Sequence, residues 1–71
     1  MSNLASDQKK AEDVAATIKA IGHPLRLRIL ALLTIGDFRV NDLVDRLGVS
    51  QSSVSHHLNI LRMRGVVSMT R

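Results

Sequence analysis

Residues 50–65 constrain the fold more than any other part of the sequence, because they combine a helix start signal, two unlike faces and a stop signal. Ser50 is a preferred N-cap residue, and Gly65 suits the left-handed residue that ends a helix. We therefore expect a helix over residues 51–64. Apolar residues at spacings of four and three form its buried stripe, namely Val54, Leu58 and Leu61. The opposite face is polar and nearly uncharged, and it carries Gln51, Ser52, Ser55, His56 and Asn59.

A solvated helix normally alternates acidic and basic residues, whereas hydroxyl, amide and imidazole groups can pair with base edges or phosphates. A shorter helix is predicted just upstream, with an apolar stripe of Val40, Leu43, Val44 and Leu47. It closes at Gly48, so that residues 48–50 alone separate the two helices. Two helices joined by a short turn that contains glycine are typical of the helix-turn-helix motif.

Two more helices are predicted before this pair. Asp7 or Ser6 can cap the first, whose stripe up to Gly22 consists of Ala11, Val14, Ala15, Ile18 and Ile21. This stripe could serve the core, a dimer interface or both. The pair His23-Pro24 then starts the second helix, for which we expect core positions at Leu27, Leu30 and Ala31.

Arg26 and Arg28 occupy the first turns of that second helix, where the helix dipole favours acidic residues. Interaction with the helix dipole therefore does not account for these two positive charges. Each is expected either to bind a neighbouring element or a phosphate, or to lie in solvent with its aliphatic stem buried.

The net charge of +4 is concentrated in the C-terminal part of the chain. Residues 1–45 contain six acidic and six basic side chains, which cancel, so the excess comes from Arg46, Arg62, Arg64 and Arg71. A basic, acid-free segment that includes a capped polar helix favours a polyanionic partner. A basic surface that only maintains solubility is the alternative. Phe38 is the only Phe, Tyr or Trp, which argues against a protein that stacks single-stranded bases.

A chain of 71 residues forms one small domain and buries only about 60% of its unfolded surface as a monomer, so we expect oligomerisation. The absence of cysteine excludes disulfides and thiolate metal sites. No window approaches the roughly 20 apolar residues of a membrane-spanning helix. Residues 1–7 resemble a flexible tail rather than a secretion signal, and the expected localisation is cytoplasmic.

Three runs of this sequence resemble the ArsR/SmtB family of winged-helix transcriptional repressors. They are residues 18–30 (IKAIGHPLRLRIL), the pair Asp42-Leu43, and residues 47–58 (LGVSQSSVSHHL). The likeness extends from Ile18 to Val67, and its motifs agree in order and spacing. It implies a homodimer that binds double-stranded DNA and releases it when a metal, metalloid or other signal arrives.

The resemblance makes the helix over residues 51–64 a recognition helix in the major groove of DNA. It implies DNA contacts at Gln51, Ser52, Ser53, Ser55 and His56. His57 and Arg62 are expected to contact phosphate or to support the scaffold, and Arg64 is expected to contact phosphate. His57 lies three residues after Val54 and four before Leu61, at the edge of the buried stripe, so packing and DNA contact stay equally open for it.

The predicted fold class is all-α with a vestigial β-strand: a winged helix-turn-helix domain of four helices over residues 8–71. Val66–Thr70 is β-prone, but no turn or return strand follows it before Arg71, so the wing is truncated and the C-terminal helix is lacking. The chain is then a fragment of a longer repressor, which we favour, or a short form that pairs this strand with another chain.

The sequence departs from the family pattern in three ways. Arg39-Val40-Asn41 stands where arsenical-sensing members carry Cys-Val-Cys, so no soft ligand remains and that sensing mode is excluded. A second family site, made of carboxylates and histidines on a C-terminal dimer helix, lies beyond Arg71, and the effector is therefore unknown. Val44 replaces the usual alanine where the motif helices cross, which predicts a slightly wider spacing between them.

Other functions fit the residues less well. A metal site from His23, His56 and His57 is not expected, because adjacent helical residues point about 100° apart. Catalysis by Ser52 with His56, or by Ser53 with His57, is not expected because no acid on the helix orients either imidazole. The sequence therefore predicts no enzyme and no cofactor. A protein-interaction module that binds another chain through its apolar first helix is the alternative function.

Overall fold

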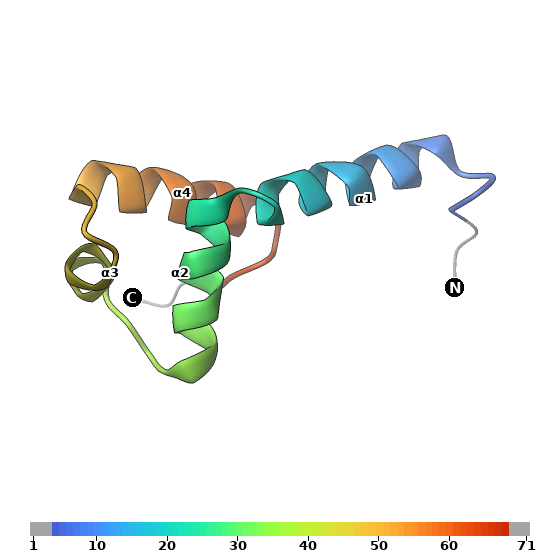
Figure 1. Cartoon of the computed structure of the whole chain (residues 1–71). Helices are drawn as coiled ribbons and strands as arrows, with labels where there is room; N and C mark the ends of the chain where they lie inside the picture. Colours follow the sequence, from blue (N-terminus) through green and yellow to red (C-terminus); the bar gives the residue numbers. More distant parts are fainter. Residues whose placement is uncertain (1–3, 69–71) are drawn as a thin grey trace.

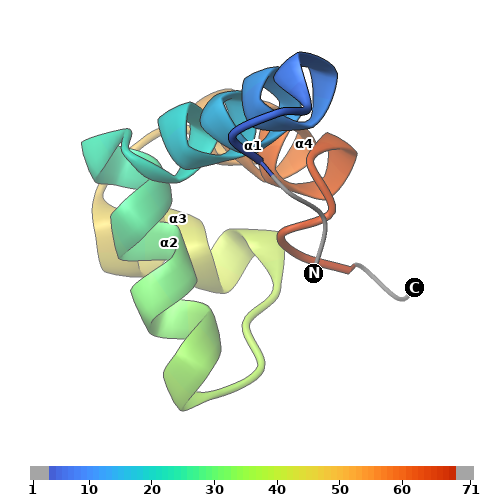
Figure 2. The ribbon, with the colours of Figure 1, turned by 90° about the vertical axis from the view of Figure 1, so that its right-hand side faces the viewer.

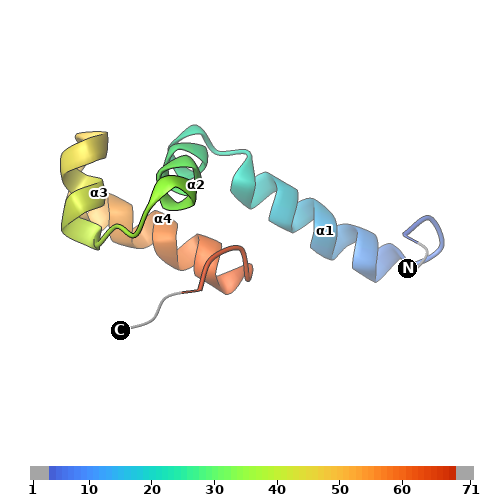
Figure 3. The ribbon, with the colours of Figure 1, turned by 90° about the horizontal axis from the view of Figure 1, so that it is seen from below.

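The computed structural model describes residues 4–68, and these fold into four helices (Figure 1). The helices are α1 (Gln8–Ile21), α2 (Pro24–Ile35), α3 (Val40–Leu47) and α4 (Gln51–Met63). The last three pack against one another, whereas the N-terminal half of α1 projects away from them (Figures 1 and 3). The molecule is accordingly elongated, with extents of 44 × 19 × 19 Å.

The core lies between α2, α3 and α4. Its buried members are Ile29, Leu43, Leu47, Val54, Leu58 and Leu61. The stripes predicted for the two helices of the motif are therefore confirmed: both carry the buried side chains that the three- and four-residue spacing places on one face. Val44 is partly buried and packs against the same cluster.

The predicted core face of α2 is wrong at two of its three positions. Ile29 is the fully buried residue, whereas Leu27 is 48% exposed and Ala31 is also exposed. Leu30 is partly buried against the core cluster. Aliphatic residues fill this helix so densely that their spacing does not define a single face, and contact with α3 and α4 selects the side that is buried.

α1 begins and ends where the sequence indicates. The Asp7 carboxylate accepts a hydrogen bond from the Lys10 amide at 2.9 Å, and the Gly22 amide donates to the Ile18 carbonyl at 2.8 Å. Its apolar stripe, however, is not used by the core of one chain. Val14 and Ile18 are 38% and 63% exposed, and Ala20 is the residue of α1 that is buried.

The C-terminal end of α4 is a Schellman turn. Gly65 has a φ of 71°, its amide donates to the Arg62 carbonyl, and the Val66 amide donates to the Leu61 carbonyl, both at 2.9 Å. The helix ends at Met63, one residue before the predicted end. Residues 66–68 form no strand, although Val66 and Val67 pack against the core; the rest of the predicted strand, Met69 and Thr70, lies outside the described residues.

A second left-handed glycine makes the turn between α3 and α4. Gly48 has a φ of 69°, and its amide donates to the Val44 carbonyl at 2.9 Å. The chain therefore leaves α3 and enters α4 within three residues, as the helix-turn-helix prediction requires. Among the described helices, none has the length and apolar character that a membrane span requires.

Replacing Gly65 with alanine isolates the cost of the left-handed turn. A Cβ there meets no atom within 4 Å, so Gly65→Ala should lower the free energy of unfolding by about 1 kcal/mol through backbone strain alone. Gly36→Ala is the matched control, because Gly36 has an extended φ of 174° and its added Cβ makes an ordinary 3.5 Å contact with Phe38. Urea denaturation of both variants tests this, and equal losses would contradict it.

Candidate nucleic-acid interface

The exposed side of α4 begins at a capped N-terminus. Ser50 Oγ accepts a hydrogen bond from the Ser53 amide at 3.1 Å, which fixes the first turn. Four of the residues predicted to contact DNA are exposed beyond this cap: Gln51, Ser52, Ser55 and His56. Ser53 and His57 are partly buried and lie at the edge of that surface. The structure thus separates the six candidates at this end of the helix into two groups.

Two arginines at the other end of α4 differ in their surroundings. Arg62 is exposed, and its Nη2 donates to Asn59 Oδ1 at 2.7 Å, so the polar side chain of Asn59 orients the guanidinium. Arg64 is partly buried, and its Nη1 lies 3.3 Å from Asp13 Oδ1 of α1. Arg64 therefore connects two helices, and local sequence cannot predict this contact because the partner is 51 positions away. The contact between Asn59 and Arg62 could have been predicted from the sequence, because residues three positions apart on a helix are neighbours.

His57 lies inside a cluster of nitrogen-containing side chains. Its Nδ1 accepts a hydrogen bond from Arg26 Nε at 3.1 Å, and its ring centroid lies 4.7 Å from that of His23. The ring of His56 is 5.1 Å away. Burial, and then the proximity of His23, Arg26 and His56, lowers the pKa of His57, which favours a neutral ring.

Arg26 binds neighbouring helices, which was one of the alternatives for it. Besides His57, it contacts α1, since its Nη1 donates to the Ala20 carbonyl at 3.1 Å. Arg28, two residues further on, is exposed, and its side chain makes no hydrogen bond in the described part of the chain. The unfavourable position of Arg26 in a first turn was the sequence signal for this role.

α1 and α4 both lie at the same end of α2, where their C-terminal ends come close to each other (Figures 1 and 2). The Arg64–Asp13 ion pair and the Arg26 hydrogen bonds both occur where these helices meet. Because the ion pair is largely exposed, it adds little stability, but it marks the side of α4 that faces α1.

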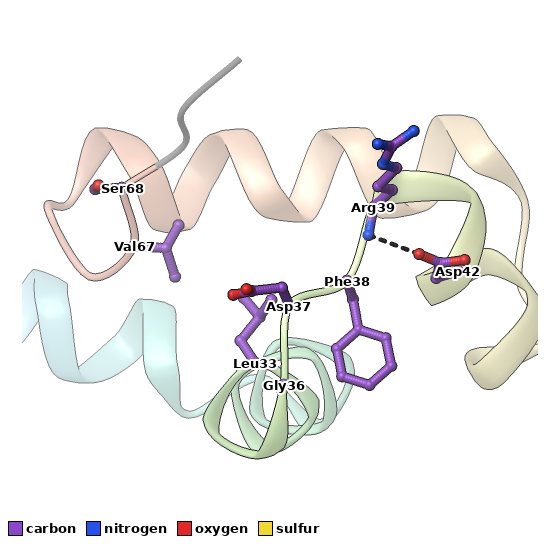
Figure 4. Close-up of a pocket in the computed structure, with 8 residues that line it drawn as sticks. All are labelled: Leu33, Gly36, Asp37, Phe38, Arg39, Asp42, Val67 and Ser68. Carbon is purple, nitrogen blue, oxygen red and sulfur yellow. Dashed lines mark hydrogen bonds between the residues drawn. The ribbon is translucent and has the colours of Figure 1, made fainter.

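A pocket of about 540 Å³ lies between the loop that joins α2 to α3 and the segment after α4 (Figure 4). It is lined by Leu33, Gly36, Asp37, Phe38, Arg39, Asp42, Val67 and Ser68. The Asp42 carboxylate accepts a hydrogen bond from the Arg39 amide at 2.9 Å and so caps α3. The guanidinium of Arg39 points away from the Asp42 carboxylate. Within residues 4–68, no group of three or more His, Cys, Asp or Glu side chains is arranged to hold a metal ion.

Comparison with known proteins gives a consistent result. Residues 23–69 match the family model described as "Bacterial regulatory protein, arsR family". The chain is 36% identical over 64 residues to the Biofilm growth-associated repressor of Xylella fastidiosa, which covers 90% of this chain and 56% of that protein. It is 44% identical over 61 residues to the HTH-type transcriptional regulator NmtR of Mycobacterium tuberculosis, covering 86% of this chain and 51% of that protein.

A third relative is the Transcriptional repressor SdpR of Bacillus subtilis, 46% identical over 50 residues, with 70% of this chain and 56% of that protein covered. The chain thus spans little more than half the length of these three relatives. No solved structure matches it.

Removing the Ser50 cap should destabilise α4, the helix that carries the candidate interface. Ser50→Ala leaves the Ser53 amide without its acceptor and should lower the free energy of unfolding by about 1 kcal/mol. Ser52→Ala serves as the control, since Ser52 is exposed and its hydroxyl makes no hydrogen bond in the described structure; a change within about 0.5 kcal/mol is expected. Urea denaturation measures both, and a Ser50→Ala variant as stable as Ser52→Ala would exclude the capping role.

Proposed function

Because the chain belongs to the ArsR family of bacterial regulatory proteins, a family of DNA-binding regulators and not of enzymes, we propose that it binds double-stranded DNA as a homodimer and represses transcription. In this proposal α4 enters the major groove and α1 joins the two copies. The names of the relatives support regulation of transcription, and two of the three cited above are called repressors.

The surface of α4 is the observation that carries the proposal. One side of this helix is fully used by the core, and the other is exposed, polar and free of carboxylates. A helix of this kind that follows a tight turn from another helix has the geometry with which helix-turn-helix proteins read base edges. The capped N-terminus adds a partial positive charge that favours phosphate.

Individual roles follow from exposure. We assign base or groove contacts to Gln51, Ser52, Ser55 and His56, whose side chains are exposed, and a phosphate contact to Arg62. Ser53 and His57 lie at the edge of the surface and rank second as DNA contacts. Arg64 Nη1 lies 3.3 Å from Asp13 Oδ1 in the free chain. Arg64 can therefore bind a phosphate only if its ion pair with Asp13 breaks.

Dimerisation through α1 is supported by the side chains that one chain leaves uncovered. Val14 and Ile18 of α1 and Leu27 of α2 are large apolar residues with more than a third of their surface exposed. A domain this small gains stability by covering such residues with a second copy. Two copies related by a two-fold axis would also place two α4 helices for two half-sites.

Alanine variants of Gln51 and Arg62 should affect DNA binding in different ways. Gln51→Ala should relax preference at one base position by about 1–3 kcal/mol. Arg62→Ala should weaken binding to all sequences alike and reduce the slope of log affinity against log salt by about one. Gel shifts over a salt series, on a duplex selected from a random pool and on its point variants, measure both effects.

Lys9→Ala is the charge-matched control, because Lys9 lies in the first turn of α1, the end of this helix that projects away from the others (Figure 1), and its loss should leave the salt slope unchanged. Equal loss on every sequence for Gln51→Ala would contradict its assignment. Absence of salt-dependent binding by the parent chain would contradict the proposed function and favour the protein-interaction alternative.

A carboxylate placed in the α1 stripe should prevent association. The parent chain is expected to sediment as a dimer at micromolar concentration, and Ile18→Glu to shift it to a monomer, since burying an unpaired charge is strongly unfavourable. Ala16→Glu introduces the same group on another side of α1 and should leave the dimer intact. A strictly monomeric parent chain, or an equal effect of the two variants, would contradict the assigned interface.

A further inference from the structure

Within residues 4–68, Arg26 is the one side chain of α2 that donates hydrogen bonds to both α1 and α4. Its Nη1 donates to the carbonyl of Ala20, in the last turn of α1, where carbonyls have no partner within the helix. Its Nε donates to His57 Nδ1, on the inner edge of α4. Both distances are 3.1 Å, and the side chain is partly buried. One guanidinium therefore connects the projecting helix to the polar helix.

The contact with His57 has a chemical requirement. Because Arg26 Nε is a donor, His57 Nδ1 must be an unprotonated acceptor, and the ring carries its proton on Nε2. The groups that shift the pKa of His57 are His23 and Arg26 from the α2 side and His56 on its own helix; none lies on α1 or α3. All of them disfavour a positive ring, and burial lowers the pKa further.

We propose that Arg26 is a positioning residue for DNA binding, which holds α4 in register with α1 and α2 only while His57 is unprotonated. This inference rests on the function proposed above. Arg26 touches no DNA in this scheme. It acts through His57, and protonation of His57 replaces an acceptor by a donor that faces the guanidinium, so the link to α4 opens while the link to Ala20 remains.

The sign of the pH effect distinguishes this role from a direct contact. A histidine that touches phosphate binds DNA more tightly as pH falls, because it becomes positive. A histidine that must stay neutral to hold α4 makes binding weaker as pH falls. The same holds for stability: since folding lowers the pKa of His57, its contribution is complete above its ordinary value of 6.5 and is lost as pH falls below that value.

The first experiment compares Arg26→Lys with Arg28→Lys in the full 71-residue chain. Lysine keeps the charge but cannot span two acceptors on different helices as the planar guanidinium does. At about pH 7.5, Arg26→Lys should weaken binding to every duplex about five- to tenfold without changing the salt slope. Arg28→Lys, the exposed control, should bind as the parent does. Sedimentation must show the same oligomeric state for all three proteins.

The second experiment measures affinity between about pH 7.5 and pH 5 in a His56→Asn background, which removes the imidazole assigned to the DNA surface. Binding should weaken as pH falls. His57→Asn should abolish this dependence, because Asn Oδ1 takes the place of Nδ1 as an acceptor that does not titrate in this range. His23→Asn should retain the dependence, since asparagine preserves the N-cap of α2.

Four outcomes would overturn the inference alone: unchanged affinity in Arg26→Lys, a salt slope reduced by about one, tighter binding at low pH in the His56→Asn background, or a dependence that survives His57→Asn. A parent chain that binds no DNA would overturn the proposed function and this role with it. NMR titration of His57 provides a readout without DNA. A neutral ring protonated on Nε2 at about pH 7.5 is expected, and an Nδ1-protonated ring would contradict the link.

Discussion

The packing of α4 against α2 and α3 is the contact on which the rest of this structure depends. Val54, Leu58 and Leu61 occupy one side of α4 and meet Ile29 and Leu43 in the core cluster. Burial of each such side chain contributes about 1.5–3 kcal/mol, and a domain of this size has few others. Because the apolar side chains bury one side of α4 in the core, the polar side chains must lie on the other side. The same contact that stabilises the fold therefore exposes the surface assigned to DNA.

α1 is subject to a different constraint. Its apolar stripe has the helical period of a core element, yet a single chain buries Ala20 and leaves Val14 and Ile18 exposed by 38% and 63%. Polar contacts hold this helix near its middle, through the Arg64–Asp13 pair, and at its last turn, through the bond from Arg26 to the Ala20 carbonyl. Polar contacts of this kind orient a helix more than they stabilise it. In the proposed dimer, α1 would be covered by its counterpart, and its orientation would then determine the separation of the two α4 helices.

Much of the candidate site could be predicted from local sequence, because helix caps and stripes depend on residues only a few positions apart. Ser50, Gly48 and Gly65 were identified as turn and cap residues from their type alone, and the structure gives them those conformations. His57 was ambiguous because it lies at a stripe edge, where one position of rotation decides between core and solvent. Its partner Arg26 is 31 positions away, and no local rule connects them.

The sequence by itself determined the helix-turn-helix: which segments are helical, where α3 ends and α4 begins, which side of α4 is apolar, and where the excess positive charge lies. Periodicity and capping are short-range properties, and each residue type carries them. Only the tertiary structure decided which side of α2 is buried, since its dense aliphatic run permits several and packing against α3 and α4 selects Ile29. It also decided the direction of α1 and the partners of Arg26 and Arg64, because these depend on where distant helices come together in space.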